Sequence, residues 1–428
     1  MPAEGLFAEK AWRWSPKPFP LAPLTVKHLE ALGNRLARFQ RASNSIYHRS
    51  RKGTLPSWIA EVLDRGKPAD LLEVAHDPGL HDAVPGVIRP DLVLTEEGFA
   101  LTELDSVPGG IGLTAWLGAA YAAIDPDGGD AIVGKADGMV EGFRSLLSAD
   151  KGADIVISRE SGDYRPEMEW LAGKLGDSWS VVSAEGYQPS GRAVYRFFEL
   201  FDLPNLPGML DLGKAQARGE LELTAPFKPW FEEKAWSAIF WLRPLRQVWR
   251  RELRDSHWRR LQKIIPYSWL VNPEPIADHA VIPRLEIQDF SELKSFSQTE
   301  RDLVLKISGF SELAWGSRSV NIGSDQSQEE WASAVDGAIS TWDRSPWVLQ
   351  EFRKGRLVRH PFWNEARGEI EILEGRVRLC PYYFIDAANR KRIRLGGVLA
   401  TICPADKKIL HGMSEAILVP CAIDPDGY

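Results

Sequence analysis

Cysteine is scarce in this sequence, with three residues among 428, at positions 380, 403 and 421. Their odd number and the lack of a CxxC pair exclude a disulfide framework and favour a reducing compartment. Long apolar runs are missing as well, since the longest are far too short to span a bilayer. The start, MPAE, lacks a basic segment followed by an apolar one, so we expect no secretory signal. We therefore expect a cytoplasmic protein without a membrane partner.

An excess of basic charge is also absent. The formal net charge is −7, which argues against a nucleic-acid binder and leaves room only for local basic patches. A hydrophobic content of 44% with 26% charged residues is typical of a folded globular protein. The length of 428 residues exceeds one ordinary core, so we expect two or three domains. No internal repeat, nucleophile elbow or zinc motif is present.

The stretch from residue 87 to residue 118 is the first candidate for chemistry. Val87–Leu94 and Phe99–Val107 are predicted strands joined by a tight turn at Glu96–Gly98. Alternation separates Leu101 and Leu104 from Glu103 and Asp105.

Pairing about this turn would place Asp91 across from the Glu103–Asp105 region, with Arg89 nearby. Crowded carboxylates repel one another unless a cation neutralises them, and Mg²⁺ prefers hard oxygen ligands. The pattern predicts a magnesium site. An exposed hairpin with its charges in water is the alternative, and the pattern alone does not separate the two.

A glycine motif follows the second strand. Residues 110–115, G-I-G-L-T-A, fit the dinucleotide fingerprint GxGxxA and suggest a dinucleotide-dependent oxidoreductase. Glu103 and Asp105 lie just upstream, where they would repel a pyrophosphate. The segment after the predicted helix, Asp125–Gly129, is a turn rather than a second strand ending in an acid. We therefore rank this function low.

The middle of the chain predicts a βαβ unit, from a strand at Asp154–Ser158, a helix at Tyr164–Leu175 and a strand at Trp179–Ala184. Tyr195–Phe201 fits either a strand or a helix. An amphipathic helix at Pro229–Trp241 carries Lys234. A second helix, from Pro244 to about Lys263, is strongly basic, which we interpret as a solvated or interface-forming face.

The last third is rich in predicted strands. They cover Arg301–Ile307, Arg318–Ile322, Trp347–Phe352, a hairpin of Glu369–Leu373 and Arg376–Pro381, and Gly397–Cys403. A capping box at Ser327–Glu330 predicts the start of a helix between the second and third of these strands. Lys306 ends the first strand before a Gly/Ser-rich loop, an arrangement that can surround phosphate oxygens with an ammonium and backbone N–H groups. The segment lacks GxxxxGK[ST], so it is no P-loop. The strand V-L-Q-E-F could offer an edge to an adenine ring.

Four motifs together resemble a known family. RPDLVL…ALTELDSVP, EEKAWSAIFW, VLKISGF…WGSRSV and WVLQEF occur in the order seen in glutathionylspermidine synthase-like proteins, over roughly residues 85–400. These proteins belong to the ATP-grasp superfamily in a circularly permuted arrangement. The resemblance implies an α+β ATP-grasp architecture with a βαβ pre-ATP-grasp subdomain. The family's amidase domain has no counterpart in this chain.

The resemblance also implies an ATP- and Mg²⁺-dependent carboxylate–amine ligase that acts through an acyl phosphate. Arg89 would be catalytic, and Asp91, Glu103 and Asp105 would hold Mg²⁺. Asp105 replaces the family's usual Asn, and Ser106-Val107-Pro108 replaces its DTP. The residues implied in nucleotide binding are Lys234, Lys306, Ser308, Gly309, Gly316, Ser317, Gln350, Glu351 and Phe352. A non-catalytic binding protein of the same shape is the alternative.

The predicted division has six segments: an arm with helices (1–85), a metal-binding hairpin and helix (86–130), the βαβ subdomain (131–225), a helical segment (226–289), a mobile nucleotide lid (290–345) and C-terminal strands (346–428). The expected partners are a small carboxylate and a small amine of the amino acid, peptide or polyamine class. Neither substrate, nor the oligomeric state, is indicated by the sequence.

Overall fold

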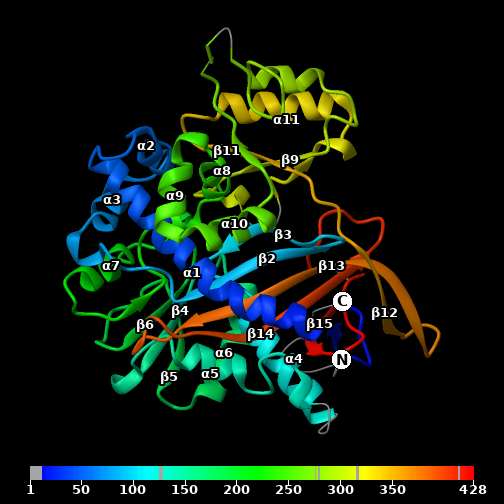
Figure 1. The fold of residues 1–428 in the computed structure, drawn as a ribbon. Helices are drawn as coiled ribbons and strands as arrows, with labels where there is room; N and C mark the ends of the chain where they lie inside the picture. Colours follow the sequence, from blue (N-terminus) through cyan, green and yellow to red (C-terminus); the bar gives the residue numbers. More distant parts are fainter. Residues whose placement is uncertain (1–11, 125–128, 275, 278–279, 315–317, 413–414) are drawn as a thin grey trace. The chain divides into compact units, whose positions relative to one another are not determined.

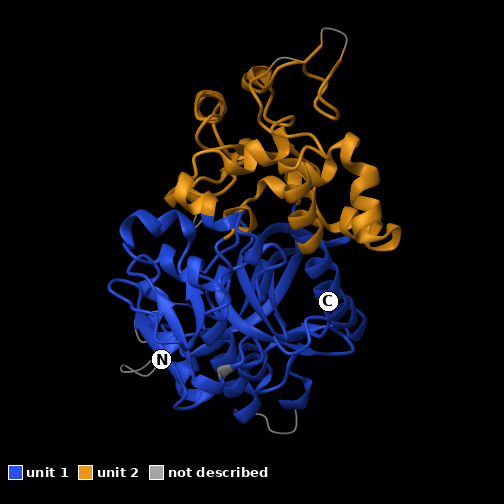
Figure 2. Cartoon of the chain, turned by 90° about the vertical axis from the view of Figure 1, so that its left-hand side faces the viewer, with its two compact units in different colours: residues 1–40, 74–227, 354–428 blue, residues 41–73, 228–353 orange. Residues whose placement is uncertain are grey.

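A computed structural model describes residues 12–428 except 125–128, 275, 278–279, 315–317 and 413–414. The chain divides into two compact units (Figure 2). Unit 1 comprises residues 1–40, 74–227 and 354–428, and unit 2 comprises residues 41–73 and 228–353. The finer division into six segments stays a prediction. Within the described residues, no helix has the length and apolarity needed to cross a membrane.

Unit 1 contains a large, mostly antiparallel sheet of seven strands. The order along the sheet is β1-β15-β14-β13-β2-β3, and β12 pairs with β13 outside this path. The strands are β1 (Phe19–Leu21), β2 (Val87–Thr95), β3 (Gly98–Asp105), β12 (Leu357–Asn364), β13 (Glu369–Ile385), β14 (Ile393–Pro404) and β15 (Ile417–Ile423). Strands from the start, the first quarter and the end of the chain therefore form one sheet.

The predicted hairpin is confirmed, with β2 and β3 antiparallel and Thr95 paired to Gly98. Its register contains a bulge, because Asp91 pairs with Glu103 while Leu92 pairs with Leu101. The extra residue, Thr102, donates its hydroxyl to the Asp91 carbonyl at 3.2 Å. A bulge adds one residue to one strand and shifts the alternation of side chains beyond it. This shift puts Leu101 and Leu104 on one face, away from Glu103 and Asp105. The separation is the one expected from the sequence, but its cause is the bulge, because strict alternation would place Leu101 on the face of Glu103.

Helices cover both faces of the large sheet. The helix α1 (Pro23–Arg51) lies on one face, where the Tyr383 hydroxyl donates to the Leu29 carbonyl at 2.7 Å (Figure 1). The neighbouring Phe384 points to the other face, and its ring lies against Gly142 of α5 (Gly138–Arg144). Successive strand residues point to opposite faces, so this pair of aromatics anchors one helix on each side. The helix α4 (Ile111–Ile124) packs beside α5.

The hairpin predicted at 369–381 is wrong, because β13 is one continuous strand that pairs with β12, β14 and β2. The predicted turn glycine, Gly375, instead lies inside the strand opposite Pro404 and Val358. A Cβ at this position would come within 2.3 Å of the Cys403 carbonyl oxygen. Glycine is therefore needed here for a close backbone approach and not for a turn.

A second sheet of unit 1 is parallel, with the order β5-β4-β6-β7. Its strands are β4 (Ala153–Ile157), β5 (Trp179–Ser183), β6 (Ala193–Phe197) and β7 (Leu223–Thr224). The helix α6 (Arg165–Leu175) connects β4 to β5, which confirms the predicted βαβ unit. The ambiguous segment Tyr195–Phe201 is a strand only up to Phe197, where β6 ends, and its last two residues begin the 3₁₀ turn η5. The helix α7 (Leu210–Ala217) and the 3₁₀ turns η1 (Pro78–Leu80), η2 (Gly129–Ala131), η3 (Ala149–Lys151), η4 (Gly162–Tyr164) and η5 (Leu200–Asn205) complete the unit.

Unit 2 has a four-stranded sheet with the order β10-β9-β11-β8. The strands are β8 (Ser268–Leu270), β9 (Leu303–Ile307), β10 (Asn321–Ile322) and β11 (Trp347–Glu351). Its helices are α2 (Trp58–Asp64), α8 (Ala235–Trp241), α9 (Arg246–Leu253), α10 (Asp255–Ile264) and α11 (Gln328–Ser340). Its 3₁₀ turns are η6 (Pro229–Glu232), η7 (Arg243–Leu245), η8 (Phe290–Ser295), η9 (Glu312–Ala314) and η10 (Gly323–Asp325). The helix α3 (Ala69–Ala75) begins in unit 2 and ends in unit 1. The predicted capping box is confirmed, because Ser327 caps α11 together with Glu330.

Two helices predicted in this region are each broken in the structure. The segment 229–241 divides into η6 and α8, and Lys234 is the N-cap residue of α8 rather than part of a first turn. The basic segment 244–263 is divided between α9 and α10 by Arg254, whose φ is 67°. A positive φ does not fit a right-handed helix, so the chain changes direction at this residue.

Candidate functional site

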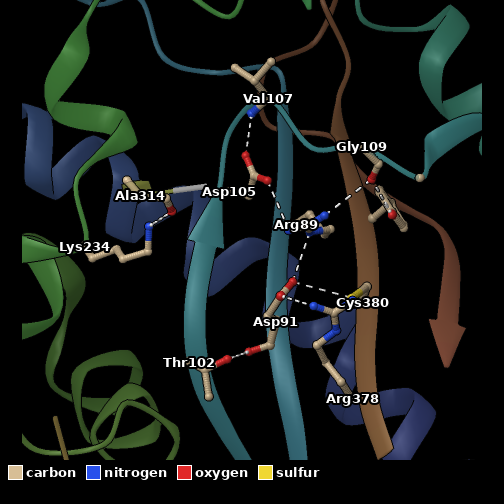
Figure 3. A network of polar contacts seen from close by, with 12 residues as sticks. Arg89, Asp91, Thr102, Asp105, Val107, Gly109, Lys234, Ala314, Arg378 and Cys380 are labelled. Carbon is tan, nitrogen blue, oxygen red and sulfur yellow. Dashed lines mark hydrogen bonds and ion pairs between the residues drawn. The ribbon is translucent and has the colours of Figure 1, made fainter. Parts of the chain in front are cut away.

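The charged face of the β2–β3 hairpin holds the first part of the candidate site. Arg89 pairs with Asp105 and Asp91 pairs with Glu103 in the antiparallel register. Directly opposite residues share a face, and so do residues two apart along a strand. The bulge leaves this relation intact because it lies beyond Asp91. All four side chains therefore lie on one face, as Figure 3 shows for Arg89, Asp91 and Asp105.

Asp91 is held between two arginines. Its Oδ1 lies 3.1 Å from Arg89 Nε, and its Oδ2 accepts from Arg378 Nη1 at 2.9 Å (Figure 3). The Cys380 thiol also donates to Oδ1, at 3.5 Å. Burial raises the pKa of Asp91, but Arg378 and Arg89 outweigh this and hold the pKa below its ordinary value. Asp91 therefore stays ionised and fixes the direction of both guanidinium groups.

Asp105 has a different environment from Asp91. Its Oδ2 lies 3.1 Å from Arg89 Nη2, and its Oδ1 accepts the Val107 N–H at 2.9 Å. Burial and the negative charge of Glu103 raise the pKa of Asp105 above its ordinary value, against the opposing effect of Arg89. Three carboxylates thus share one face with two guanidinium groups, so one negative charge remains when all three are ionised.

This excess charge fits a divalent cation. Across the described residues, no group of three or more His, Cys, Asp or Glu side chains is arranged to hold a metal ion by itself. Mg²⁺ seldom needs such a cage, because it commonly binds one or two carboxylates together with substrate phosphates and water. Glu103 and Asp105 supply the donor type it prefers. The residues therefore fit Mg²⁺ that is carried in with a phosphate ligand.

The glycine motif at 110–115 has a structural explanation. The N–H groups of Gly110 and Leu113, at the start of α4, both donate to the Glu167 carboxylate at 2.7 Å. A Cβ on Gly112 would lie 2.1 Å from the Glu167 carbonyl oxygen, so this glycine permits close packing of α4 on α6. The helix N-terminus that would receive a pyrophosphate already holds a carboxylate. The preceding strand is also antiparallel, unlike that of a dinucleotide fold.

Lys234, in unit 2, lies at the N-cap of α8. Its Nζ donates to the Ala314 carbonyl at 3.1 Å (Figure 3), and its backbone N–H donates to the Ser308 carbonyl at 2.9 Å. The Ser308 hydroxyl accepts the Ala235 N–H at 2.8 Å and donates to the Glu233 carboxylate. Ser308 therefore ties the end of β9 to the start of α8, and its hydroxyl bonds to protein groups.

Lys306 is a buried lysine on β9, one of the two inner strands of the unit 2 sheet. Its Nζ donates to Gln350 Oε1 at 3.1 Å, and Gln350 Nε2 donates to the Ser268 hydroxyl at 3.1 Å. This row of polar groups crosses from β9 through β11 to β8. Lys306 and Gln350 are thus brought together in the structure, although 44 positions separate them.

The remaining predicted nucleotide residues differ in their surroundings. Glu351 forms ion pairs with Arg284 at 2.6 Å and Arg353 at 2.9 Å. The Phe352 N–H donates to the Asp302 carbonyl at 3.1 Å. A Cβ on Gly309 would lie 2.5 Å from the Glu232 carbonyl oxygen, so only glycine fits beside η6. Gly316 and Ser317 lie outside the described residues.

Sequence reasoning missed three participants. Arg378 and Cys380 contact Asp91, and Glu167 caps α4. Arg378 lies between buried Val377 and Leu379 along β13, which was a detectable signal for one charged side chain on the other face of the strand, whereas Cys380 is itself buried. Their proximity to Asp91 required the pairing of β13 with β2, for which the sequence offers no sign. The predicted metal-binding residues lie in unit 1, and the predicted nucleotide-binding residues lie in unit 2.

Comparison with known proteins gives a likeness of fold. No family model and no curated protein matches the sequence. Among solved structures, a glutathione synthetase-like effector from Globodera pallida in its apoform matches with a TM-score of 0.54 and 10% identity, over 96% of this chain and 90% of that one. A putative gamma-glutamylcysteine synthetase from Methylobacillus flagellatus matches with a TM-score of 0.38 and 12% identity, over 95% and 90%. The chain thus shares a mixed α+β fold with a glutathione synthetase-like protein.

Proposed function

We propose that this protein is an ATP- and Mg²⁺-dependent ligase that joins a small carboxylate to a small amine. The observation that carries the proposal is the charged face of the β2–β3 hairpin, where the register pairs Arg89 with Asp105 and Asp91 with Glu103. The same motifs carry the resemblance to glutathionylspermidine synthase-like, circularly permuted ATP-grasp ligases. The solved structure with the shared fold is described as glutathione synthetase-like, which supports a ligase.

The reaction needs ATP because a carboxylate oxygen is a poor leaving group. In the first step, a carboxylate oxygen of the substrate attacks the γ-phosphorus, the bond to the β-phosphate oxygen breaks, and ADP and an acyl phosphate form. In the second step, the amine nitrogen attacks the acyl carbon, inorganic phosphate leaves, and the nitrogen loses a proton to solvent. No nucleophile from the protein is required, which agrees with the absence of nucleophile motifs from the sequence.

The arginines of unit 1 offset the repulsion between two anions. Arg89 and Arg378 are oriented by the ionised Asp91, so their positive charge is in place before any substrate arrives. Glu103 and Asp105 would bind Mg²⁺ together with phosphate oxygens and water, while Asp91, the third ligand predicted from the sequence, has both its oxygens in contact with the arginines. When bound, Mg²⁺ supplies charge neutralisation at the phosphate oxygens. Asp105, in place of the family's Asn, gives this chain one more negative charge toward the metal.

The lysines of unit 2 would bind the triphosphate. Lys234 is fixed by its backbone at the start of α8, and Lys306 by Gln350 on the neighbouring strand. Each side chain ends in an ammonium group, which carries a positive charge and can donate up to three hydrogen bonds. The loop after β9 would close over the phosphates, and the edge of β11 from Gln350 to Phe352 would contact the adenine.

Phosphate release tests the proposal directly. Purified protein is incubated with ATP and Mg²⁺ and with pooled amino acids, peptides and polyamines, and the products are identified by mass spectrometry. Phosphate release that depends on both a carboxylate and an amine, with a condensed product, is the expected result. Tight ATP binding without turnover in any pool would favour the non-catalytic alternative. Binding of NAD(P) without ATP would favour the oxidoreductase.

A further inference from the structure

A buried ion pair in unit 2 belongs to none of the groups assigned above. Lys67 Nζ lies 2.5 Å from Glu233 Oε1, and the two side chains are 0% and 1% exposed. The partners are 166 positions apart in the sequence, and Lys67 comes from the early segment 41–73. Burying two charges is costly, and such pairs are retained in some proteins because they specify one arrangement of the surrounding groups.

The ion pair connects directly to the predicted phosphate-binding elements. Glu233 immediately precedes Lys234, and its second carboxylate oxygen accepts the Ser308 hydroxyl. Ser308 in turn receives the N–H groups of Lys234 and Ala235 through its carbonyl and its hydroxyl. One continuous chain of polar contacts therefore leads from Lys67 to the backbone of Lys234.

Lys67 also reaches the loop that follows Ser308. Its Nζ lies 5.4 Å from the centre of the Phe310 ring, within the range of a cation–π contact. Phe310 has a φ of 45°, an uncommon conformation for a residue with a side chain. The Lys67 ammonium therefore contacts Glu233, which binds the Ser308 hydroxyl, and also Phe310, which follows Ser308 in the same loop.

The segment that carries Lys67 is itself held in place. Gly66 has a φ of 69°, and a Cβ there would lie 2.1 Å from the Arg344 carbonyl oxygen. Arg65 lies over the Trp342 ring at 4.4 Å. Arg65 and Gly66 both pack against the segment that precedes β11. These contacts hold the backbone beside Lys67 in place, so its ammonium stays close to Glu233.

We propose that Lys67 is a positioning residue for the nucleotide, which holds Lys234 and the loop Ser308–Phe310 in the geometry that receives the phosphates. The inference rests on the proposed function and adds to it a residue from a distant part of the chain. A residue that only stabilised the fold would affect the melting temperature without affecting ATP binding.

The test combines hydrogen exchange without nucleotide and ATP titration of the full-length protein. In Lys67→Met, amide exchange in peptides containing Lys234 and Ala235 should become about tenfold faster, because the Ser308 bonds open more often. The KM for ATP should rise about tenfold with little change in kcat, since a ground-state contact is loosened. Lys67→Arg, which keeps the charge, should restore most of the affinity.

Ser50→Ala is the matched control. It removes a buried hydroxyl that donates to the Pro56 carbonyl at 2.6 Å in the same unit, and this hydroxyl bonds to the backbone of the segment 56–60. Ser50→Ala should lower stability without changing exchange at Lys234 or the affinity for ATP. If Lys67→Met unfolds the protein, the double variant Lys67→Met/Glu233→Gln removes both charges and should show the same two changes.

Unchanged exchange at Lys234 and Ala235 in a folded Lys67 variant would overturn the inference, as would equal effects of Lys67→Met and Ser50→Ala on ATP affinity. Failure of the wild-type protein to bind ATP would instead overturn the proposed function. The exchange measurement needs no nucleotide, so the two failures are distinguishable.

Discussion

Arg378 Nη1 lies 2.9 Å from Asp91 Oδ2, although 287 positions separate the two residues in the sequence. The contact forms because β13, from the end of the chain, pairs with β2. It is largely buried, with the Arg378 side chain 20% exposed and that of Asp91 6% exposed. This ion pair turns a charged hairpin into a cluster whose guanidinium groups have fixed directions.

Replacement of Arg378 should affect both stability and activity. Arg378→Met leaves the buried Asp91 with fewer positive partners, so its pKa should rise and the free energy of unfolding should fall by about 2 kcal/mol. ATP turnover should fall as well, because a preorganised positive charge is lost. Urea denaturation and phosphate release measure the two effects. Arg376→Met on the same strand is the control, because Arg376 donates to the Gly355 carbonyl and should leave turnover unchanged.

Glu103→Gln tests the metal assignment. The change removes one carboxylate charge from the proposed Mg²⁺ site while keeping the shape of the side chain, so ATP turnover should fall at least roughly hundredfold. The fold should be retained, because the pKa of Asp105 is raised partly by Glu103 and this repulsion disappears.

Glu97→Gln provides the control for this variant, since Glu97 lies exposed in the turn of the same hairpin. Turnover is measured across a range of Mg²⁺ concentrations for both proteins. Wild-type turnover in Glu103→Gln would mean that the metal binds elsewhere.

Lys306→Met should weaken ATP binding by about tenfold to hundredfold, the range expected when a hydrogen bond from a charged group is lost. Methionine keeps much of the apolar stem, so the packing between β9 and β11 should be preserved. Isothermal titration of ATP with Mg²⁺ measures the change. Lys294→Met is a suitable comparison, because Lys294 pairs with Asp336 near the surface. An affinity equal to that of the wild type would remove Lys306 from the site.

We predict that protonation of His360 in the unfolded chain lowers the free energy of unfolding in mild acid. Its ring is buried beside Ser15 and Lys17, and burial lowers its pKa from 6.5 to about 4. The unfolded chain therefore binds a proton between pH 6.5 and about pH 4 while the folded protein does not. This contribution to stability is complete above pH 6.5 and is lost as the pH falls toward 4.

The expected size is on the order of 2 kcal/mol between pH 7.5 and pH 4.5, because this range ends above the pKa of the folded protein. Thermal unfolding of the wild type and of His360→Gln at pH 7.5, 6 and 4.5 measures it. The difference between the two proteins should change by this amount over the series. A constant difference across the three pH values would show that His360 does not titrate on unfolding in this range.

Local patterns in the sequence were sufficient for several elements. Two strands with a Glu-Glu-Gly turn predicted the β2–β3 hairpin, and a Ser-x-x-Glu capping box predicted the start of α11. These features depend on residues close together in the chain, whose turn chemistry and alternation act over a few positions. The candidate residues Arg89, Asp91, Glu103 and Asp105 were accessible to sequence reasoning for the same reason.

Other features depended on partners far away in the chain. Gly375 has the signature of a turn, but the Cys403 backbone beside it makes it a close-approach position in a continuous strand. Arg254 has a positive φ and ends a helix inside a helical pattern, although no proline or glycine at this position predicts a break. The contacts of Arg378 with Asp91 and of Lys67 with Glu233 join segments that no local rule connects. The sequence determined which chemical groups are available, while the pairing of distant strands and loops decided which of them meet, because contact between them is set by tertiary packing and not by spacing along the chain.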